Sequence, residues 1–384
     1  MKRRILGITA IRSEYFFQRP IFEAIRQHPD LNLELIVTGA HLSPLHGYTI
    51  KEVETDGFPV RARIDCLLYS DRDASRLKGA ALQLSSLIPI VDTLRPDWLL
   101  VPADREEAIT MALCGAYMNI ATAHYSAGDR VVGNVDDTVR QAVSRLSHLL
   151  LTTSEDSRQR LIRAGEEEWR VHNVGHAGLD RIRTTPQLSS EKLAEALGVS
   201  QIEKSYVVVV QHSISSEVDQ ASFQMRETLE AIVQLKIPAF VSYPNSDPGS
   251  QQIVRVIEEF AQHSYIRVFR SIPDIPFVNL LRRASALVGN SSMGVLEAPF
   301  LRLPVINVGR RQTARFHDAN IFFVDHDRHR IAAQLRDILE NDEVRRRAQN
   351  CSNPFGDGHT GERVAHLLAV TPMGSSLLNK DLTY

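Results

Sequence analysis

Short apolar segments alternate with longer amphipathic ones along most of the chain. Residues 4–9 form an apolar segment of strand type, and residues 17–27 follow with apolar side chains at helical spacing. The second half restarts the pattern with a β-branched run at residues 206–210, which is typical of a strand buried on both faces. Strand–helix alternation of this kind predicts parallel sheets covered by helices on both faces.

The alternation pauses once, where Gly175, Gly178 and Pro186 punctuate the sequence. A chain of 384 residues is long enough for two domains that each have a core. We therefore predict an α/β protein with a first Rossmann-like domain at residues 1–175 and a second at 185–365. Doubly wound sheets bind ligands at the carboxyl ends of their strands, so we expect the ligand in a cleft between the two domains. Residues 366–384 are predicted to form a flexible C-terminal tail.

The most informative single stretch runs over residues 289–299, after an apolar segment at 284–288 and before a helical pattern at 295–301. The hydroxyl groups of Ser291 and Ser292 would supply donors, and Gly294 would let backbone approach a ligand closely. Free N–H groups at a helix start favour an anion. Glu297, one turn further on, would accept from sugar hydroxyls. An ordinary strand-to-helix turn capped by serine fits this stretch equally well.

Composition excludes several classes of protein. The net charge of −2 favours neither nucleic acid nor an anionic membrane as a partner. No stretch approaches the ~20 apolar residues of a membrane span, and the apolar run after the basic N-terminus is too short for a signal peptide. The cysteines, Cys66, Cys114 and Cys351, are odd in number and widely spaced, which suits a cytoplasmic location.

Polar residues follow several predicted strands of the first half. Arg12 follows the first strand and would clamp a phosphate, although a plain surface arginine is the simpler interpretation. Asp104 and Arg105 follow a later strand, and Asp136 opens a helix. Helix capping explains one of these carboxylates. Several acids at the ends of strands are nevertheless what acid–base chemistry at carbon and oxygen requires.

The second half carries a comparable set. His212 follows the buried strand at 206–210, Asn245 follows the next strand, and Arg311 and Arg315 follow the strand after residue 304. Together with Arg12 and the two serines, His212 and either Arg311 or Arg315 form a candidate diphosphate site, with Glu297 on the ribose. No residues are spaced as metal ligands, so we expect protein donors rather than a metal ion to neutralise the phosphates.

These motifs resemble the hydrolysing UDP-N-acetylglucosamine 2-epimerases of the sialic-acid and legionaminic-acid type. The resemblance extends from about residue 5 to about residue 368. The most specific segments are residues 243–250 (YPNSDPGS), 289–299 (GNSSMGVLEAP) and 304–315 (PVINVGRRQTAR). Further matching positions are Asp104 with Arg105, Asp136 and Asp137 with Arg140, Gln211 with His212, and residues 355–358.

The resemblance implies a GT-B-like architecture with the nucleotide held mainly by the C-terminal domain, and it implies no cofactor. The nucleoside diphosphate would be eliminated to give a glycal, and water would then add with inversion at C2. Asp104, Asp136 and His212 would be the catalytic residues, His212 contacting the departing phosphate. The substrate-binding residues would be Arg12, Arg105, Ser126, Asn245, Ser291, Ser292, Glu297, Arg311 and Arg315. We also expect a homo-oligomer, either a dimer or a tetramer.

The residues of the first domain that are expected to contact the sugar depart from the family pattern. The usual His-Ile-Glu-Gly-Gly is here residues 124–128 (HYSAG), so that Ser126 replaces an expected glutamate. A serine hydroxyl does not act as a base near neutral pH without an activating partner. We predict a 2-epimerase acting on UDP-N-acetylglucosamine or a related UDP- or GDP-linked 2-acetamido sugar. The alternatives are an enzyme that performs only the elimination or hydrolysis half, a non-catalytic nucleotide-sugar binder, and a GT-B glycosyltransferase.

Overall fold

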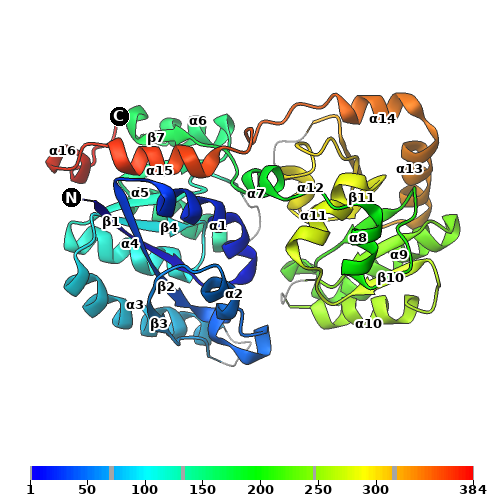
Figure 1. Ribbon diagram of the computed structural model, residues 1–384, viewed down its shortest axis with the longest axis horizontal. Coiled ribbons are helices and arrows are strands. Elements are labelled where there is room, and N and C mark those ends of the chain that lie inside the picture. The colour runs from blue at the N-terminus through cyan, green and yellow to red at the C-terminus, as the bar shows by residue number, and fades with distance from the viewer. Residues whose placement is uncertain (1, 69–72, 131–134, 245–247, 314–317, 384) are drawn as a thin grey trace. The chain divides into compact units, whose positions relative to one another are not determined.

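The computed structural model describes residues 2–68, 73–130, 135–244, 248–313 and 318–383. The chain forms two compact units, each built on its own sheet (Figure 1). The first comprises Met1–Arg183 together with Pro354–Tyr384, and the second comprises Thr184–Asn353. These boundaries differ from the predicted ones, because the chain returns to the first unit at Pro354 rather than remaining in the second to residue 365.

The described part of the first unit contains a parallel sheet of seven strands in the order β3-β2-β1-β4-β5-β6-β7. The central strands β1 and β4 are buried almost throughout, which explains their continuous apolar sequences. The strands are β1 Arg3–Thr9, β2 Leu31–Thr38, β3 Val60–Ile64, β4 Trp98–Pro102, β5 Ala121–Tyr125, β6 Leu149–Thr152 and β7 Val171–Asn173.

Helices connect these strands and cover both faces of the sheet, as the alternating sequence pattern predicts (Figure 1). The helices of the first unit are α1 Arg12–Gln27, α2 Ile50–Thr55, α3 Asp73–Leu94, α4 Glu106–Met118, α5 Val135–Leu146, α6 Glu155–Arg163, α7 Gly178–Thr184, α15 Thr360–Val370 and α16 Ser375–Leu378. The last residue of α7 falls just past the boundary of the unit.

The second unit repeats this arrangement with a parallel sheet of six described strands in the order β10-β9-β8-β11-β12-β13. Its strands are β8 Val207–Val210, β9 Ala239–Ser242, β10 Ile266–Phe269, β11 Ala286–Gly289, β12 Val305–Val308 and β13 Ile321–Val324. Its helices are α8 Ser190–Leu197, α9 Ala221–Leu235, α10 Ser250–Phe260, α11 Asp274–Arg283, α12 Met293–Leu296, α13 Arg328–Glu340 and α14 Asp342–Gln349.

The structure corrects two expectations from the sequence. The helix predicted at residues 295–301 is only the four-residue α12, which ends at Leu296. The C-terminal tail, predicted to be flexible, packs on the first unit instead. Arg170, directly before β7, is fully buried and donates to the carbonyl oxygens of Ser376 (2.9 Å), Leu377 (2.6 Å) and Asn379 (2.8 Å).

Contacts of two further side chains, Lys380 and Trp98, attach the C-terminal segment to the same unit. The Lys380 ammonium donates to the carbonyl oxygens of Ser144 and Ser147, both at 2.8 Å, and pairs with the buried Glu166 carboxylate at 2.7 Å. The Trp98 indole, on the central strand β4, donates to the Leu368 carbonyl oxygen of α15 at 3.1 Å. The segment from Pro354 onward therefore belongs to the first unit and is not an appendage.

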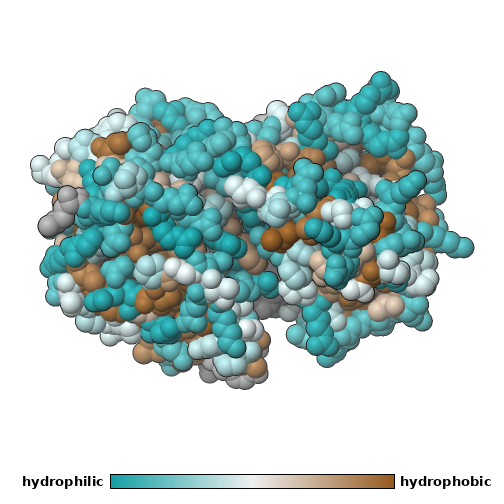
Figure 2. Space-filling model, viewed as in Figure 1, coloured by the Kyte–Doolittle hydropathy of each residue, from teal (hydrophilic) through white to brown (hydrophobic). Residues whose placement is uncertain are grey.

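The visible surface is mostly hydrophilic, with apolar residues in separate patches (Figure 2). A surface of this kind is normal for a globular protein. Among the residues that the structure describes, no helix combines the length and the apolar character needed to cross a membrane.

Replacing Arg170 with methionine should lower the free energy of unfolding by about 3–5 kcal/mol, because buried carbonyl oxygens would lose their donor. Urea denaturation followed by circular dichroism measures this change. Arg63→Met is a control in the same unit, because the Arg63 side chain is 55% exposed; it should change stability by no more than about 0.5 kcal/mol. Equal effects of the two substitutions would contradict the role given to Arg170.

Candidate functional site

Each sheet reverses its strand order once, between β1 and β4 in the first unit and between β8 and β11 in the second. In doubly wound folds, ligands bind at the carboxyl ends of the strands where the order reverses, since the loops there run to opposite faces. Arg12, Asp104 and Arg105 follow β1 and β4, and His212 and Ser291 follow β8 and β11. Topology therefore assigns these five predicted site residues to one reversal point in each unit.

Arg140, in α5, organises the polar residues that follow β4 and β5. Its guanidinium group is ion-paired with Asp104, donates to the Ser126 carbonyl oxygen at 2.7 Å and lies 4.0 Å from the Asp129 carboxylate. The Arg140 side chain is only 5% exposed. A buried guanidinium shared by two carboxylates holds both in fixed positions. The sequence contained Arg140 in a family motif but gave no reason to assign it this role.

The Asp129 carboxylate is fixed by hydroxyl donors as well. Thr153 Oγ1 donates to it at 2.6 Å and Ser157 Oγ at 2.8 Å. Asp129 lies three residues after Ser126, the position where the family pattern places a glutamate. The first unit thus has a carboxylate close in sequence to the serine and bound into the same Arg140 network.

Ser126 and Ala103 both have left-handed backbone conformations, with φ values of 60° and 38°. Such values are uncommon outside glycine and favour a chain that turns abruptly as it leaves a strand. The Ser126 side chain is buried, and the residue is 6% exposed. The substitution of serine here therefore removes an acid without creating an exposed nucleophile.

His124 fixes the turn after β4. Its Nε2 lies 2.7 Å from the Ala103 carbonyl oxygen, which only accepts, so Nε2 carries the proton and donates. Nδ1 then accepts from the Ser144 hydroxyl at 3.1 Å. Burial lowers the pKa of His124 to about 3, so the ring is neutral near physiological pH. A neutral, fully bonded histidine of this kind is structural.

The other predicted residues of the first unit are engaged in ion pairs. Asp136 lies 3.5 Å from Arg76 of α3. Arg12 is ion-paired with Glu52 at 3.0 Å, and its guanidinium carbon lies 5.0 Å from the centre of the Phe16 ring. The Arg12 side chain is 33% exposed, so a ligand phosphate would compete with Glu52 for it.

Asn290 is the corresponding organiser in the second unit. Its side chain forms two reciprocal hydrogen bonds with His212, accepting from the backbone N–H at 2.7 Å and donating to the carbonyl oxygen at 2.8 Å. The Asn290 carbonyl oxygen accepts from Arg311 at 3.1 Å and from the Gln312 amide at 3.0 Å. One fully buried residue therefore links the loops that follow β8, β11 and β12.

Gly289 allows this close approach. Its φ is 132°, and a Cβ atom there would lie 2.1 Å from the Val210 carbonyl oxygen at the end of β8. Any side chain would push apart the two strands on which His212 and Asn290 depend.

Ser291, Ser292 and Glu297 surround α12 and are half-buried. Ser291 Oγ accepts from the Met293 backbone N–H at 3.4 Å. Because α12 has only four residues, the helix dipole expected from the sequence contributes little here, and side-chain and backbone donors remain as the basis of an anion site.

Asn245 and Arg315 lie outside the described residues. Within the described ranges, no group of three or more His, Cys, Asp and Glu side chains is arranged to hold a metal ion.

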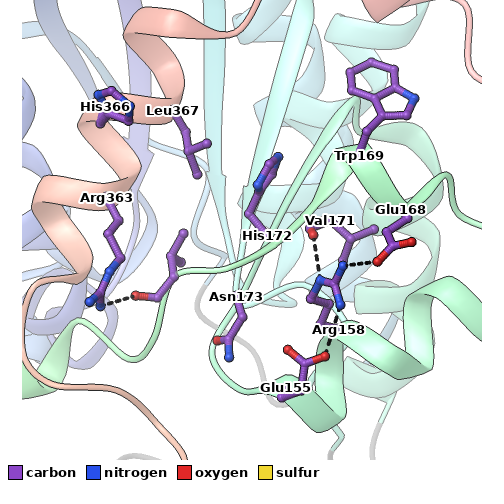
Figure 3. Close-up of a pocket in the computed structure, with 11 residues that line it drawn as sticks. Glu155, Arg158, Glu168, Trp169, Val171, His172, Asn173, Arg363, His366 and Leu367 are labelled. Atoms are coloured by element: carbon purple, nitrogen blue, oxygen red, sulfur yellow. Dashed lines mark hydrogen bonds and ion pairs between the residues drawn. The ribbon is translucent and has the colours of Figure 1, made fainter.

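A separate pocket of about 500 Å³ lies along the edge strand β7, between α6 and α15 (Figure 3). Its cations are already paired: Arg158 with Glu155 and Glu168, and Arg363 with Asp357. None of the predicted site residues that the structure describes lines this pocket, so we do not assign the chemistry to it.

Two Rossmann-like units, each with polar residues at the reversal of its sheet, define a GT-B-like protein. The fold is also that of the crystal structure of UDP-GlcNAc 2-epimerase from Neisseria meningitidis bound to UDP-GlcNAc. That structure is similar with a TM-score of 0.81 at 17% sequence identity, covering 95% of this chain and 99% of that one.

The sequence comparisons identify the family. Residues 23–369 match the family described as UDP-N-acetylglucosamine 2-epimerase, and the chain belongs to it. The UDP-N,N'-diacetylbacillosamine 2-epimerase (hydrolyzing) of Legionella pneumophila is 32% identical over 384 residues, covering 100% of both chains. The GDP/UDP-N,N'-diacetylbacillosamine 2-epimerase (hydrolyzing) of Campylobacter jejuni is 31% identical over 323 residues, covering 83% of this chain and 84% of that protein.

Replacing Asn290 with alanine should lower the free energy of unfolding by about 1–3 kcal/mol, because the His212 backbone groups would lose their partners. Chemical denaturation measures the change. Asn32→Ala, at an exposed position of β2, is the control and should be nearly neutral. A neutral Asn290→Ala substitution would show that the reciprocal pair does not stabilise the second unit.

Proposed function

We propose that this chain is a hydrolysing nucleotide-sugar 2-epimerase. It would convert a UDP- or GDP-linked 2-acetamido sugar into the free manno-configured sugar and a nucleoside diphosphate. The observation that carries the proposal is the pair of carboxylates, Asp104 and Asp129, held by the buried Arg140 after adjacent strands. Two fixed carboxylates are the groups that a stepwise elimination and hydration need. The membership of the 2-epimerase family supports the same reaction.

In this proposal the second unit binds the nucleotide. Ser291 and Ser292 contact the diphosphate, and Glu297 accepts from the ribose hydroxyls. His212 contacts the departing phosphate from a backbone fixed by Asn290. Arg311 donates to the Asn290 carbonyl oxygen and adds positive charge to the site. Asn245 and Arg315 remain predicted contacts from the sequence alone.

The first unit would act on the sugar. A carboxylate removes the C2 proton, a C1–C2 double bond forms, and the C1–O bond to the diphosphate breaks with its electron pair leaving on the phosphate. Water then adds its hydroxyl to C1 of the glycal, and C2 receives a proton from the opposite face. Asp104 and Asp136 are the predicted acid–base groups. We propose that Asp129 supplies the carboxylate that Ser126 lacks, because Arg140, Thr153 and Ser157 hold it in place.

The altered sugar-side residues favour a modified substrate. The two curated relatives described above are named for N,N'-diacetylbacillosamine linked to UDP or GDP. We therefore propose a UDP- or GDP-linked 2,4-diacetamido sugar as the first substrate to test, with UDP-N-acetylglucosamine as the second. Arg12, Arg105 and Ser126 are the proposed substrate contacts in this unit. A cytoplasmic homo-oligomer, either a dimer or a tetramer, stays a prediction for size-exclusion chromatography with light scattering and for cell fractionation.

The function is tested by incubating the protein with each nucleotide sugar in D₂O and following the reaction by NMR. We expect free nucleoside diphosphate and a manno-configured sugar that carries deuterium at C2. A glycal or an unepimerised free sugar would restrict the activity to half of the reaction. Turnover only when an acceptor is added would identify a glycosyltransferase, and nucleotide binding without turnover of any donor would identify a binding protein.

Asp104→Asn should lower kcat by about 10²–10⁴-fold, because it removes a proton-transfer group and keeps the shape of the side chain. Affinity for the nucleoside diphosphate, measured by isothermal titration calorimetry, should stay unchanged, since the second unit supplies that site. Asp92→Asn, with a 61% exposed side chain in α3, should leave both quantities unchanged. An Asp104→Asn enzyme that keeps wild-type kcat would exclude Asp104 from the chemistry.

A further inference from the structure

Two buried carboxyl groups meet at the strand-order reversal of the first sheet. Glu14 lies in the first turn of α1, after β1, and Glu107 lies in the first turn of α4, after β4. The two residues are 5% and 2% exposed. Buried carboxylates need donors or a proton, because an unpaired charge is costly away from water.

Each of the two side chains has an oxygen without a donor. Glu14 Oε2 and Glu107 Oε1 are both buried and have no hydrogen-bond partner among the described residues. The two carboxyl groups lie within hydrogen-bonding reach of each other. Ionised carboxylates only accept hydrogen bonds, so two facing carboxylates repel each other. A single proton between them gives one group a donor and the other an acceptor, which satisfies both oxygens.

The charged groups around Glu14 and Glu107 also favour a single proton shared between the two carboxyl groups. Arg105 Nε lies 3.7 Å from Glu107 Oε1 and also lacks a hydrogen-bond partner among the described residues. Asp104, which precedes Arg105 in the same turn, adds negative charge nearby. Burial raises the pKa of Glu14, and the charges of Glu107 and then Asp104 raise it further against the opposing effect of Arg105. With one proton on the pair, Arg105 and the two glutamates form a neutral buried group.

We propose that Glu14 is protonated near neutral pH and donates a hydrogen bond to Glu107, and that Glu107 in turn positions Arg105. Glu14 and Glu107 are positioning residues in this scheme, since they act through Arg105. The inference of a shared proton depends only on the buried pair of Glu14 and Glu107. The catalytic consequence rests on the proposed function, in which Arg105 contacts the sugar side of the substrate.

Infrared spectroscopy tests the shared proton without requiring any turnover. Near neutral pH the wild-type protein should show the carbonyl stretch of a protonated carboxylic acid above the amide I band. Labelling glutamate with ¹³C at the side-chain carboxyl should move this band to lower frequency. Glu14→Gln should abolish it. Absence of the band in the wild type, or its persistence in Glu14→Gln, would overturn the proposal.

Stability as a function of pH gives a second readout. A raised folded-state pKa means that the native protein holds a proton that the unfolded chain releases, so this contribution to stability is lost as pH rises through the folded pKa of Glu14. Glu14→Gln cannot release a proton there. Its thermal midpoint relative to wild type should therefore rise as pH increases from the ordinary range of a glutamate towards the raised folded-state pKa of Glu14. A difference that is independent of pH would contradict a raised pKa of Glu14.

Kinetics test the positioning role. Glu14→Ala leaves Glu107 without its donor and should reduce kcat/KM for the nucleotide sugar by about 10²-fold through a misplaced Arg105. Glu14→Gln keeps a donor to Glu107 and should restore most of the loss, and nucleoside diphosphate affinity should be unchanged in both. Equal losses in the two variants would overturn the positioning role. Lack of wild-type turnover with every sugar would instead refute the proposed function and leave the infrared result valid.

Discussion

The reversal of strand order in each parallel sheet is the constraint on which the site depends. Loops after β1 and β4, and after β8 and β11, leave neighbouring strands for opposite faces. Their polar groups are only partly accessible to water, so they must find partners within the protein. Arg140 and Asn290 provide these partners in the first and second unit. Arg140 thereby fixes carboxylates, and Asn290 the backbone of His212, that the proposed reaction uses.

This arrangement gives the two units different tasks in the proposed reaction. Carboxylates dominate the first unit, where Arg140 holds Asp104 and Asp129. Backbone groups, hydroxyls and a histidine dominate the second, where Asn290 holds His212. Acids suit proton transfer at carbon, and donors suit a diphosphate. The replacement of a family glutamate by Ser126 is tolerable in this account because the Arg140 network already contains another acid.

The sequence predicted the central strands and most of the long helices because buried parallel strands have nearly unbroken apolar runs. It missed β3, β7 and β13, which are edge strands with only partly buried side chains. The sequence also could not predict hydrogen bonds between segments that lie far apart in the chain. Arg170 bonds to carbonyl oxygens more than 200 residues away, and no local pattern indicates such a contact. The sequence named the candidate site residues by type and position, and their roles stay predictions. The partners of Asp104 and His212 were visible only in three dimensions.

Hydrogen–deuterium exchange with mass spectrometry tests the division of tasks most directly. A nucleoside diphosphate alone should slow exchange in the second unit, at residues 211–214, 289–293 and 309–313, and leave residues 102–105 and 126–130 of the first unit unchanged. An intact nucleotide sugar, under conditions that prevent turnover, should add protection at residues 102–105 and 126–130. Protection of residues 102–105 and 126–130 by the diphosphate alone, or no protection of the second unit, would contradict the account.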